Sequence, residues 1–418
     1  MPNKDKNIPK RRFKAFENDP AWELRKLGEV VTRVTRKNSE LLTELALTIS
    51  AQHGLIDQTE FFDKRIASKD VSGYYLLKNG EFAYNKSTSY DAPWGAVKRL
   101  DRYDMGVLST LYIVFGISNP ERVSSNFLVT YFDTNLWHKE VQAVAAEGAR
   151  NHGLLNISAN DFLDIALFFP KSFSEQEAIG TFFSTLDQQI TLHQRKLDKL
   201  KSVKQAYLSE MFPAEGERVP KRRFPGFTDD WELRKLGEVA RFRRGSFPQP
   251  YGNSEWYDGD GAMPFVQVAD VTDEMNLVED TKQKISKKAQ PLSVYAEKGS
   301  VLVTLQGSIG RVAITQYGAF IDRTVLIFEN FYLPIDNLFW AYVIKQKFIE
   351  EAKSAPGGTI KTITKEVLSD FNIKLPTHAE QEAIGTFFST LDQHITLHQR
   401  KLEKLKNLKK ALLNELFV

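Results

Sequence analysis

Basic side chains cluster in short segments that also contain glycine, serine and aromatic residues. These segments are residues 241–247 (RFRRGSF), 282–288 (KQKISKK) and 306–311 (QGSIGR). The net charge is only +3 and by itself indicates no particular partner, so the positions of the charges carry more information than their sum. The first 37 residues hold eleven Lys or Arg against five Asp or Glu, which fits a solvated terminus as well as an arm that contacts phosphate groups.

The sequence lacks the common signatures of a catalytic site. It has no GxxxxGK[ST] phosphate loop, no GxGxxG turn after a strand, no GxSxG elbow and no HExxH motif. Cysteine is absent, which excludes disulfides, zinc–thiolate sites and thiol nucleophiles and fits a reducing cytoplasm. The charged N-terminus and the lack of a long apolar run predict a soluble protein that is not exported. We therefore expect a cytoplasmic recognition protein rather than an enzyme, with no catalytic residue and no metal ligand.

The elements that must position the basic segments occur twice in the chain. The repeated segments are 9–13, 22–30 and 175–201 in the first half and 220–224, 231–239 and 380–406 in the second. Across the longest of them the two copies differ only at Gln189 against His394 and at Asp198 against Glu403. A repeat period of about 200 residues predicts two large units rather than a solenoid of short ones. The repeated frames are expected to do the same job twice, such as docking to each other or to two copies of one partner.

Between these frames the two halves stop matching. Residues 38–150 have no visible counterpart in residues 240–355, so the two interiors are expected to do different jobs. Short apolar or alternating runs separated by Gly and Asn predict strands at 73–77, 108–114, 301–305, 312–315 and 324–328. Helices are predicted at 338–354 and over part of 135–150. The composition is therefore α+β rather than a doubly wound series.

The longest repeated segment predicts a long amphipathic helix in each half. Its apolar positions recur at alternating spacings of four and three, as in a coiled-coil seam: Ile179, Phe183, Leu186, Ile190, His193, Leu197 and Leu200, and likewise Ile384, Phe388, Leu391, Ile395, His398, Leu402 and Leu405. Ser174 can cap the first helix. Each helix has about 40 residues and would span roughly 60 Å. An antiparallel pair is favoured, because each helix then carries its own globular domain away at the opposite end.

Histidines on these helices permit a second interpretation of the seam. His193 and His398 fall on the seam, where a single polar residue most often sets the register. His394 and His398 have the i,i+4 spacing of zinc ligands, but Gln189 takes the place of His394 in the first helix. The difference argues against a metal site.

Taken together, these parts resemble the DNA specificity (S) subunit of bacterial type I restriction-modification systems. The resemblance covers nearly the whole chain and the order of its parts. It is carried by the two WELRKLGEV openings, the two EQEAIGTFFSTLDQxITLHQRKLxKLK helices, the helix tails Lys204–Leu208 and Lys409–Leu413, and the GSIGR turn that ends at Arg311.

The resemblance implies two α/β target recognition domains, joined and spaced by two long helices that form an antiparallel coiled coil with pseudo-two-fold symmetry. The implied division is a first recognition domain with its N-terminal frame at 1–170, the first helix at 171–213, a second recognition domain at 214–376 and the second helix at 377–418. Two methyltransferase (M) subunits would dock on the repeated helices, and restriction/translocase (R) subunits would join them. S-adenosylmethionine, ATP and magnesium would then bind to those partner subunits and none to this chain.

The same resemblance implies sequence-specific binding of double-stranded DNA, with one short base sequence read by each domain and an unread spacer between them. Arg and Lys suit guanine, whereas Asn and Gln suit adenine. The residues expected to bind DNA are Asn85, Lys86, Ser87, Lys98 and Arg99 in the first domain and Arg243, Arg244, Lys282, Gln306, Ser308, Arg311 and Arg323 in the second. The residues expected to form the coiled coil or to dock partners are Phe182, Leu186, Ile190, Leu197, Leu200, Phe387, Leu391, Ile395, Leu402 and Leu405.

Two other classes of protein remain open from the residues alone. A coiled-coil scaffold would explain the helices but not the two large and unlike interiors, and it predicts no DNA footprint. An RNA-binding module would be expected to expose stacking aromatic residues on a sheet, and no such pattern is visible. Competition between duplex DNA and RNA separates these readings.

Overall fold

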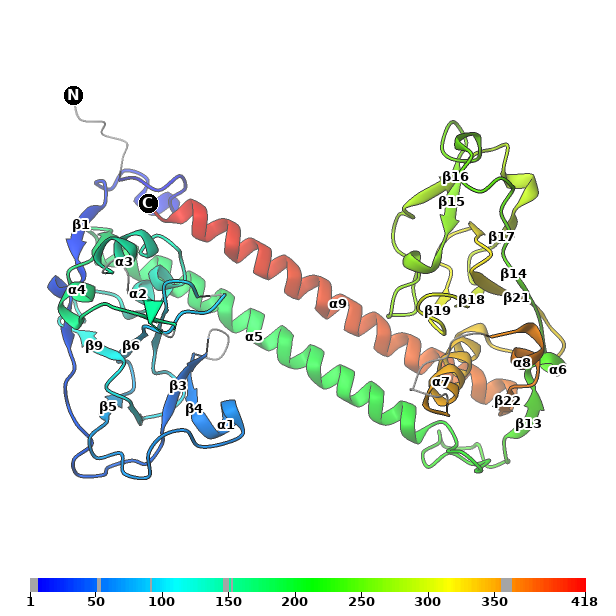
Figure 1. Cartoon of the computed structure of the whole chain (residues 1–418), viewed down its shortest axis with the longest axis horizontal. Coiled ribbons are helices and arrows are strands. Elements are labelled where there is room, and N and C mark those ends of the chain that lie inside the picture. The colour runs from blue at the N-terminus through cyan, green and yellow to red at the C-terminus, as the bar shows by residue number, and fades with distance from the viewer. Residues whose placement is uncertain (1–6, 51–53, 91, 146–149, 152, 355–362) are drawn as a thin grey trace. The chain divides into compact units, whose positions relative to one another are not determined.

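The computed structural model describes residues 7–418 except 51–53, 91, 146–149, 152 and 355–362. Its internal contacts divide the chain into two compact units (Figure 1). Unit 1 comprises the residues up to His193 together with Lys401–Val418, and unit 2 comprises Gln194–Arg400. No helix in the described part of the chain is both long and apolar enough to cross a membrane.

Unit 1 is built around a four-stranded antiparallel sheet. In spatial order its strands are β2 (Val31–Arg33), β9 (Ile113–Ile117), β6 (Phe82–Asn85) and β7 (Ala96–Arg99). Strand pairs extend this unit: β3 (Leu47–Ser50) with β4 (Gly54–Asp57), β5 (Tyr75–Lys78) with β8 (Met105–Leu108), and β10 (Arg150–Asn151) with β11 (Leu154–Leu155). Buried aromatic rings fill the space between sheet and helices, and Tyr84 stacks on Phe162 with ring centroids 4.1 Å apart.

Short helices complete unit 1. They are α1 (Gln58–Phe62), α2 (Ser125–Phe132), α3 (His138–Val144) and α4 (Ala159–Leu163), with 3-10 turns at Lys14–Phe16 and Leu27–Glu29. The predicted helix within 135–150 is thus α3, and residues 146–149 of that range lie outside the described residues. The sequence did not predict α2.

Unit 2 contains a four-stranded sheet of the same kind. Its spatial order is β14 (Ala240–Arg244), β21 (Val325–Phe331), β18 (Val301–Thr304) and β19 (Val312–Ile314). A second sheet has the order β16 (Gln283–Ile285), β15 (Met263–Val266), β20 (Ala319–Ile321) and β17 (Val294–Ala296). Its helices are α6 (Leu236–Val239), α7 (Asn337–Ser354) and α8 (Lys365–Ser369), with 3-10 turns at Ser254–Trp256, Val268–Asp270 and Gln290–Leu292.

The two main sheets share one topology although their sequences do not match. In each, the first strand pairs with the last strand, which pairs in turn with one strand of a hairpin. Strand β2 therefore corresponds to β14, β9 to β21, and the β6–β7 hairpin to the β18–β19 hairpin. The two interiors thus have a common architecture that sequence comparison does not reveal.

One predicted strand is wrong in its extent. Residues 108–114 form the end of β8, a turn closed by the hydrogen bond from Tyr112 N to Ser109 O (3.1 Å), and the start of β9. The two strands belong to different sheets. One continuous apolar run therefore forms parts of two strands that pair with different partners.

The repeated frames form matching strand pairs and helix caps in the two units. Strand β1 (Glu23–Lys26) pairs with β12 (Ala166–Phe169) in unit 1, and β13 (Glu232–Lys235) pairs with β22 (Asn372–Leu375) in unit 2. Both pairs are antiparallel. Ser158 caps α4, and Thr364 caps α8 in the same way.

The two long helices are α5 (Phe173–Glu210) and α9 (His378–Leu416). The side chain of Ser172, rather than the predicted Ser174, caps α5 by accepting from Glu175 N (3.4 Å). Each unit contains part of both helices. In unit 1 the start of α5 packs against the end of α9, in a core that includes Phe183 and Leu416.

In unit 2 the end of α5 packs against the start of α9, where the rings of Tyr207 and Phe387 lie 5.2 Å apart. The helices are therefore antiparallel in each unit, and the predicted α+β composition with an antiparallel helix pair is confirmed.

Candidate nucleic-acid interface

In unit 2 the strand register brings several of the predicted DNA-binding residues together at one end of the strands of the main sheet, which we call the edge of the sheet. Arg244 at the end of β14 lies opposite Leu326 near the start of β21. The β18–β19 loop leaves the sheet at the same edge, since Leu305 N donates to Thr324 O (2.8 Å). The residues gathered there are Arg243, Arg244, Gln306, Ser308 and Arg323.

The side chains at this edge differ in their exposure and in the contacts that they make within the protein. Gln306 and Ser308 are exposed on the loop. Arg323 is exposed too, with its guanidinium 5.4 Å from the ring centroid of Tyr251. Arg243 Nε lies 3.5 Å from Glu329 Oε1, and Arg244 Nη2 donates to Ile363 O (3.2 Å). The loop and Arg323 are therefore the parts most available to a ligand.

Arg311 and Lys282 occupy different settings. Arg311 lies at the base of the loop, where its Nε is 3.0 Å from Asp273 Oδ1 and its Nη1 donates to Val271 O (3.3 Å). Lys282 has an exposed side chain, and its backbone N–H donates to Asp270 Oδ1 (3.3 Å). Arg311 is thus held by its own domain, whereas the ammonium group of Lys282 reaches solvent.

Three polar residues beside Arg323 were not predicted. Gln267 Nε2 donates to Tyr251 Oη (2.9 Å), and Tyr251 Oη donates to Asp322 Oδ2 (3.4 Å). Burial, followed by the charge of Asp322, raises the pKa of Tyr251, so its hydroxyl stays protonated and can donate. These residues come from three separate segments that only the fold brings together, so no local sequence signal identifies them.

Unit 1 has a corresponding edge formed by the β6–β7 loop. Three predicted residues lie where β6 ends and this loop begins: Asn85, Lys86 and Ser87. Asn85 Oδ1 accepts from Ser87 N (3.0 Å), which shapes the turn, and Lys86 Nζ donates to Ile157 O (3.4 Å). Ser87 is exposed.

Lys98 and Arg99 lie at the opposite end of this hairpin. Arg99 pairs with Phe82 at the start of β6, not with Asn85 at its end. Its Nη1 donates to Ser125 Oγ (2.8 Å) at the start of α2, and Lys98 Nζ donates to Asp133 Oδ1 (3.0 Å) after the end of α2. The structure therefore does not bring this pair together with Asn85–Ser87, and both side chains hold α2.

The predicted coiled-coil and docking residues fall into two groups. Leu186, Leu197, Ile395 and Leu402 are buried, whereas Ile190, Leu200, Leu391 and Leu405 are partly exposed. Phe182 and Phe387 are half-buried under rings of the repeated frames, with Phe13 5.6 Å from Phe182 and Phe224 5.7 Å from Phe387. These two phenylalanines are therefore less available to a partner than the sequence suggested, because the PKRRF segments cover them.

Leucines at equivalent places in the repeat are more exposed. Leu192 on α5 is 44% exposed and Leu397 on α9 is 60% exposed. Because they are exposed at the same place in both copies of the repeat, they are apolar side chains that two copies of one partner can reach.

In unit 1 the repeated segment EQEAIG at the start of α5 holds the N-terminal end of α2. Gln176 Oε1 accepts a hydrogen bond from Ser124 N (3.0 Å). A Cβ atom at Gly180 would lie 2.5 Å from Phe127 N, so only glycine allows this approach. The ring of Phe127 packs edge-on against Trp22, with centroids 5.8 Å apart.

In unit 2 the same segment at the start of α9 holds α7 through equivalent contacts. Gln381 Oε1 accepts from Asp336 N (3.2 Å), and the ring of Phe339 lies 5.7 Å from that of Trp231. A Cβ atom at Gly385 would lie 2.7 Å from Phe339 N. The step from Ser124 to Phe127 equals the step from Asp336 to Phe339. Helices α2 and α7 therefore dock in the same register.

A buried ion pair anchors each frame to its long helix. Arg12 Nη2 lies 2.6 Å from Glu175 Oε2 in unit 1, and Arg223 Nη2 lies 2.7 Å from Glu380 Oε2 in unit 2. The hydrogen bonds with these carboxylates raise the pKa of both arginines. Because nearly all of each pair is removed from water, removal of one partner would leave an uncompensated charge. Within the described ranges, no group of three or more His, Asp or Glu is placed to hold a metal ion.

Comparisons with known proteins agree with this architecture. Residues 228–407 match the family model described as type I restriction modification DNA specificity domain. A putative type I restriction enzyme MjaX specificity subunit from Methanocaldococcus jannaschii is 22% identical over 421 residues, which cover 98% of this chain and 96% of that protein. The type I restriction enzyme MjaVIII specificity subunit of the same organism is 24% identical over 217 residues, covering 51% of this chain and 47% of that protein.

A solved structure has the same fold over its whole length. The type I restriction-modification system S subunit from M. genitalium has a TM-score of 0.64 and 14% sequence identity, with 98% of this chain and 99% of that chain covered. The matched specificity domain and the full-length relative make this chain similar to the DNA specificity (S) subunits of type I restriction-modification systems, and the solved S subunit shares its fold.

Proposed function

We propose that each interior is a separate DNA reader and that the chain reads an asymmetric target in two parts with an unread spacer between them. The observation that carries this proposal is the common sheet order of two interiors whose edge residues differ. The β18–β19 loop carries Gln306 and Ser308, whereas the β6–β7 loop carries Lys86 and Ser87. Readers with one fold and different side chains select different bases, so two unlike half-sites are expected.

Polar and charged residues of unit 2 suit two kinds of DNA contact. Lys282 has a free-standing ammonium group that suits phosphate oxygens, and such contacts supply affinity that falls with salt. Gln306 and Arg323 have planar polar groups that suit base edges in the major groove. We therefore assign base reading to the loop and to Arg323, and we assign phosphate contact to Lys282.

We also propose that the chain itself catalyses no reaction and acts by placing partner subunits on the DNA. Two methyltransferase subunits would dock on the repeated helices, because Leu192 and Leu397 offer the same exposed apolar position twice. Restriction/translocase subunits would join that assembly. S-adenosylmethionine, ATP and magnesium would be bound by these partners.

An exchange of one interior tests whether the readers are independent. Residues 31–156 are replaced by the matching interior of another S subunit, and the chain is expressed with its methyltransferase in a host free of methylation. We expect one half of the methylated target to change while the other half and the spacer stay the same. A change in both halves at once would show that the two interiors do not read separately.

A further inference from the structure

A lysine and an aspartate of the repeated helices form an ion pair in each unit. In unit 1 Lys409 Nζ on α9 lies 2.7 Å from Asp187 Oδ1 on α5. In unit 2 Lys204 Nζ on α5 lies 2.5 Å from Asp392 Oδ1 on α9. The two lysines occupy the same place in the repeat, as do the two aspartates. We call this arrangement the helix ion pair.

In unit 1 the recognition domain completes the helix ion pair with a second pair of charges. Asp133, directly after α2, accepts from Lys409 Nζ (2.8 Å) and from Lys98 Nζ (3.0 Å). Burial raises the pKa of Asp133, but the charges of Lys98 and Lys409 lower it by more, so this carboxylate stays ionised. With Asp187 the cluster contains two ammonium groups and two carboxylates, and its charges balance.

In unit 2 the recognition domain completes the pair with a neutral group. Tyr342 on α7 donates its hydroxyl hydrogen to Asp392 Oδ2 (2.5 Å), and Lys204 Nζ lies 5.3 Å from the centroid of its ring. Burial, followed by the charge of Asp392, raises the pKa of Tyr342 and keeps its hydroxyl protonated. The contact from the recognition domain therefore adds no charge to the helix ion pair of unit 2.

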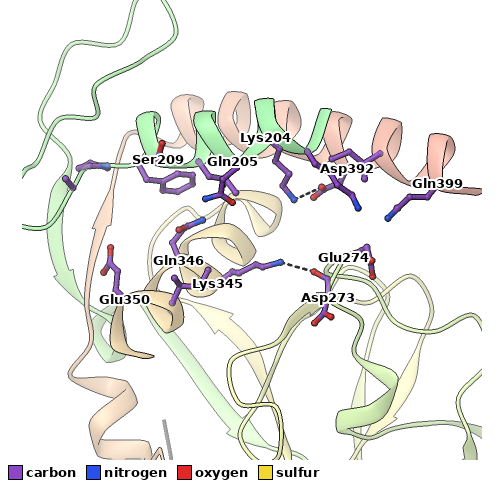
Figure 2. Close-up of a pocket in the computed structure, with 17 residues that line it drawn as sticks. Lys204, Gln205, Ser209, Asp273, Glu274, Lys345, Gln346, Glu350, Asp392 and Gln399 are labelled. Carbon is purple, nitrogen blue, oxygen red and sulfur yellow. Dashed lines mark hydrogen bonds and ion pairs between the residues drawn. The ribbon is translucent and has the colours of Figure 1, made fainter. Parts of the chain in front are cut away.

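Because α2 and α7 dock in the same register, the residues that contact the helix ion pair can be compared between the units, and they lie at different positions. Asp133 lies six residues after Phe127, and the residue six after Phe339 is Lys345. Lys345 donates to Asp273 O (2.9 Å) and lines a pocket of about 490 Å³ beside Lys204 (Figure 2). Burial, then the charge of Lys204, lowers its pKa. A lysine at this position cannot accept from the helix ion pair, so α7 uses Tyr342, one turn earlier.

We propose that Asp133 and Tyr342 are positioning residues that set the angle of each recognition domain on the long helices. The ring contacts under Trp22 and Trp231 hold only the N-terminal ends of α2 and α7. The hydrogen bonds accepted by the glutamines of the two EQEAIG segments act at the same ends, so small rotations about these ends remain. A charge-assisted hydrogen bond is directional and short. A second contact, directly after the end of α2 in unit 1 and one turn further along α7 in unit 2, therefore restricts the remaining rotation. The consequence for DNA reading rests on the proposed function.

Distance measurements between spin labels test the positioning role in the free chain. The chain contains no cysteine, so labels attach only where cysteine is introduced. In unit 2 the exposed residues Thr386 on α9 and Lys298 before β18 provide a pair of sites. We expect Tyr342→Phe to broaden or shift the measured distance distribution. The matched control is Tyr317→Phe, because that hydroxyl donates to Val278 O (2.7 Å) within the recognition domain itself.

A second variant tests unit 1 in the same way. Asp133→Asn leaves two ammonium groups with one carboxylate, and labels at Thr110 and Lys404 report on the angle. A broader distribution in both variants supports the proposal. Unchanged distributions in Tyr342→Phe and Asp133→Asn, together with a lower melting temperature, would overturn it, since the two residues would then only stabilise the fold.

Methylation of DNA gives a readout that the folded fraction does not affect. With the partner methyltransferase present, methylation rates are measured on targets with the native spacer and on targets whose spacer is one base pair longer or shorter. The first rate is divided by the second. We expect Tyr342→Phe to lower this ratio about tenfold, a factor that corresponds to about 1.4 kcal/mol. An unchanged ratio counts against the inference. If the label distances change but the wild-type chain shows no two-part target, the proposed function fails and the positioning role stands.

Discussion

Substitution of Gly180 by alanine probes the contact between α5 and α2. An alanine Cβ at this position would lie 2.5 Å from Phe127 N, and 2.6 Å from both Asn126 C and Asn126 Cβ. Real Cβ contacts essentially never fall below 3.0 Å, so the first turn of α2 must move away by about half an ångström or more. Two of these three atoms belong to the backbone and cannot move by a change of rotamer.

The size of the effect follows from two opposing terms. Alanine in place of glycine within a helix favours folding by about 1 kcal/mol. Overpacking of this kind costs about 1–3 kcal/mol, and backbone atoms at the contact place the cost in the upper half of that range. We therefore expect a net loss of about 1–2 kcal/mol for Gly180→Ala. Gly385→Ala should cost less, because the nearest atom there is the carboxylate oxygen of Asp336, a side-chain atom.

Hydrogen exchange of the full chain measures both units at once. Gly180→Ala should raise the exchange rate of α2 amides about tenfold, as expected for about 1.4 kcal/mol, and leave α7 unchanged. Gly385→Ala should affect α7 and spare α2, so each variant is the control for the other. Slower exchange of α2 in Gly180→Ala would mean that only helix propensity acts at this position, and the close contact would be refuted.

Three further predictions concern charge, DNA contact and assembly. The folded-state pKa of Asp133 is lowered, since two neighbouring ammonium groups outweigh the effect of burial. Its contribution to stability is therefore complete above the ordinary value of 3.8 and is lost as pH falls through the lowered pKa. The difference in melting temperature between wild type and Asp133→Asn should be largest near neutral pH and shrink below 3.8. Arg323→Ala should cost about 1–3 kcal/mol and relax one target position, whereas Lys282→Ala should weaken all sequences alike and reduce the salt slope by about one, as measured by titrations at several salt concentrations. Leu192→Glu and Leu397→Glu should each remove one methyltransferase subunit in native mass spectrometry, and retention of two in both variants would exclude these leucines as docking sites.

The long helices and frames could be predicted because their signals are local and occur twice. The heptad spacing identifies α5 and α9, and the repeated WELRKLGEV segments mark β1 and β13. Helix α2 was missed because Val129, Thr130 and several aromatic residues favour strands. Its docking under Trp22 and its Ser124 cap outweigh that preference. The shared spacing of a capping residue and a phenylalanine in α2 and α7 is the signal that could have revealed it.

The candidate DNA-binding edge could be predicted only in part. Gln306 and Ser308 were identified because a glycine-rich turn between two strands places them on a loop. Lys98 and Arg99 were predicted for the same domain as Asn85, but the hairpin register places Arg99 and Asn85 at opposite ends of the β6–β7 hairpin. Tyr251, Gln267 and Asp322 come together through pairing between distant strands, which composition and spacing do not encode.

The most direct test of two separate readers on one chain is the set of bases methylated in a cell. The intact chain is expressed with its partner methyltransferase in a host without other methylation, and modified bases are mapped across the genome. We expect a single asymmetric motif of two short specified parts separated by a spacer of fixed length and free sequence. One continuous motif, or methylation that does not depend on this chain, would contradict the account.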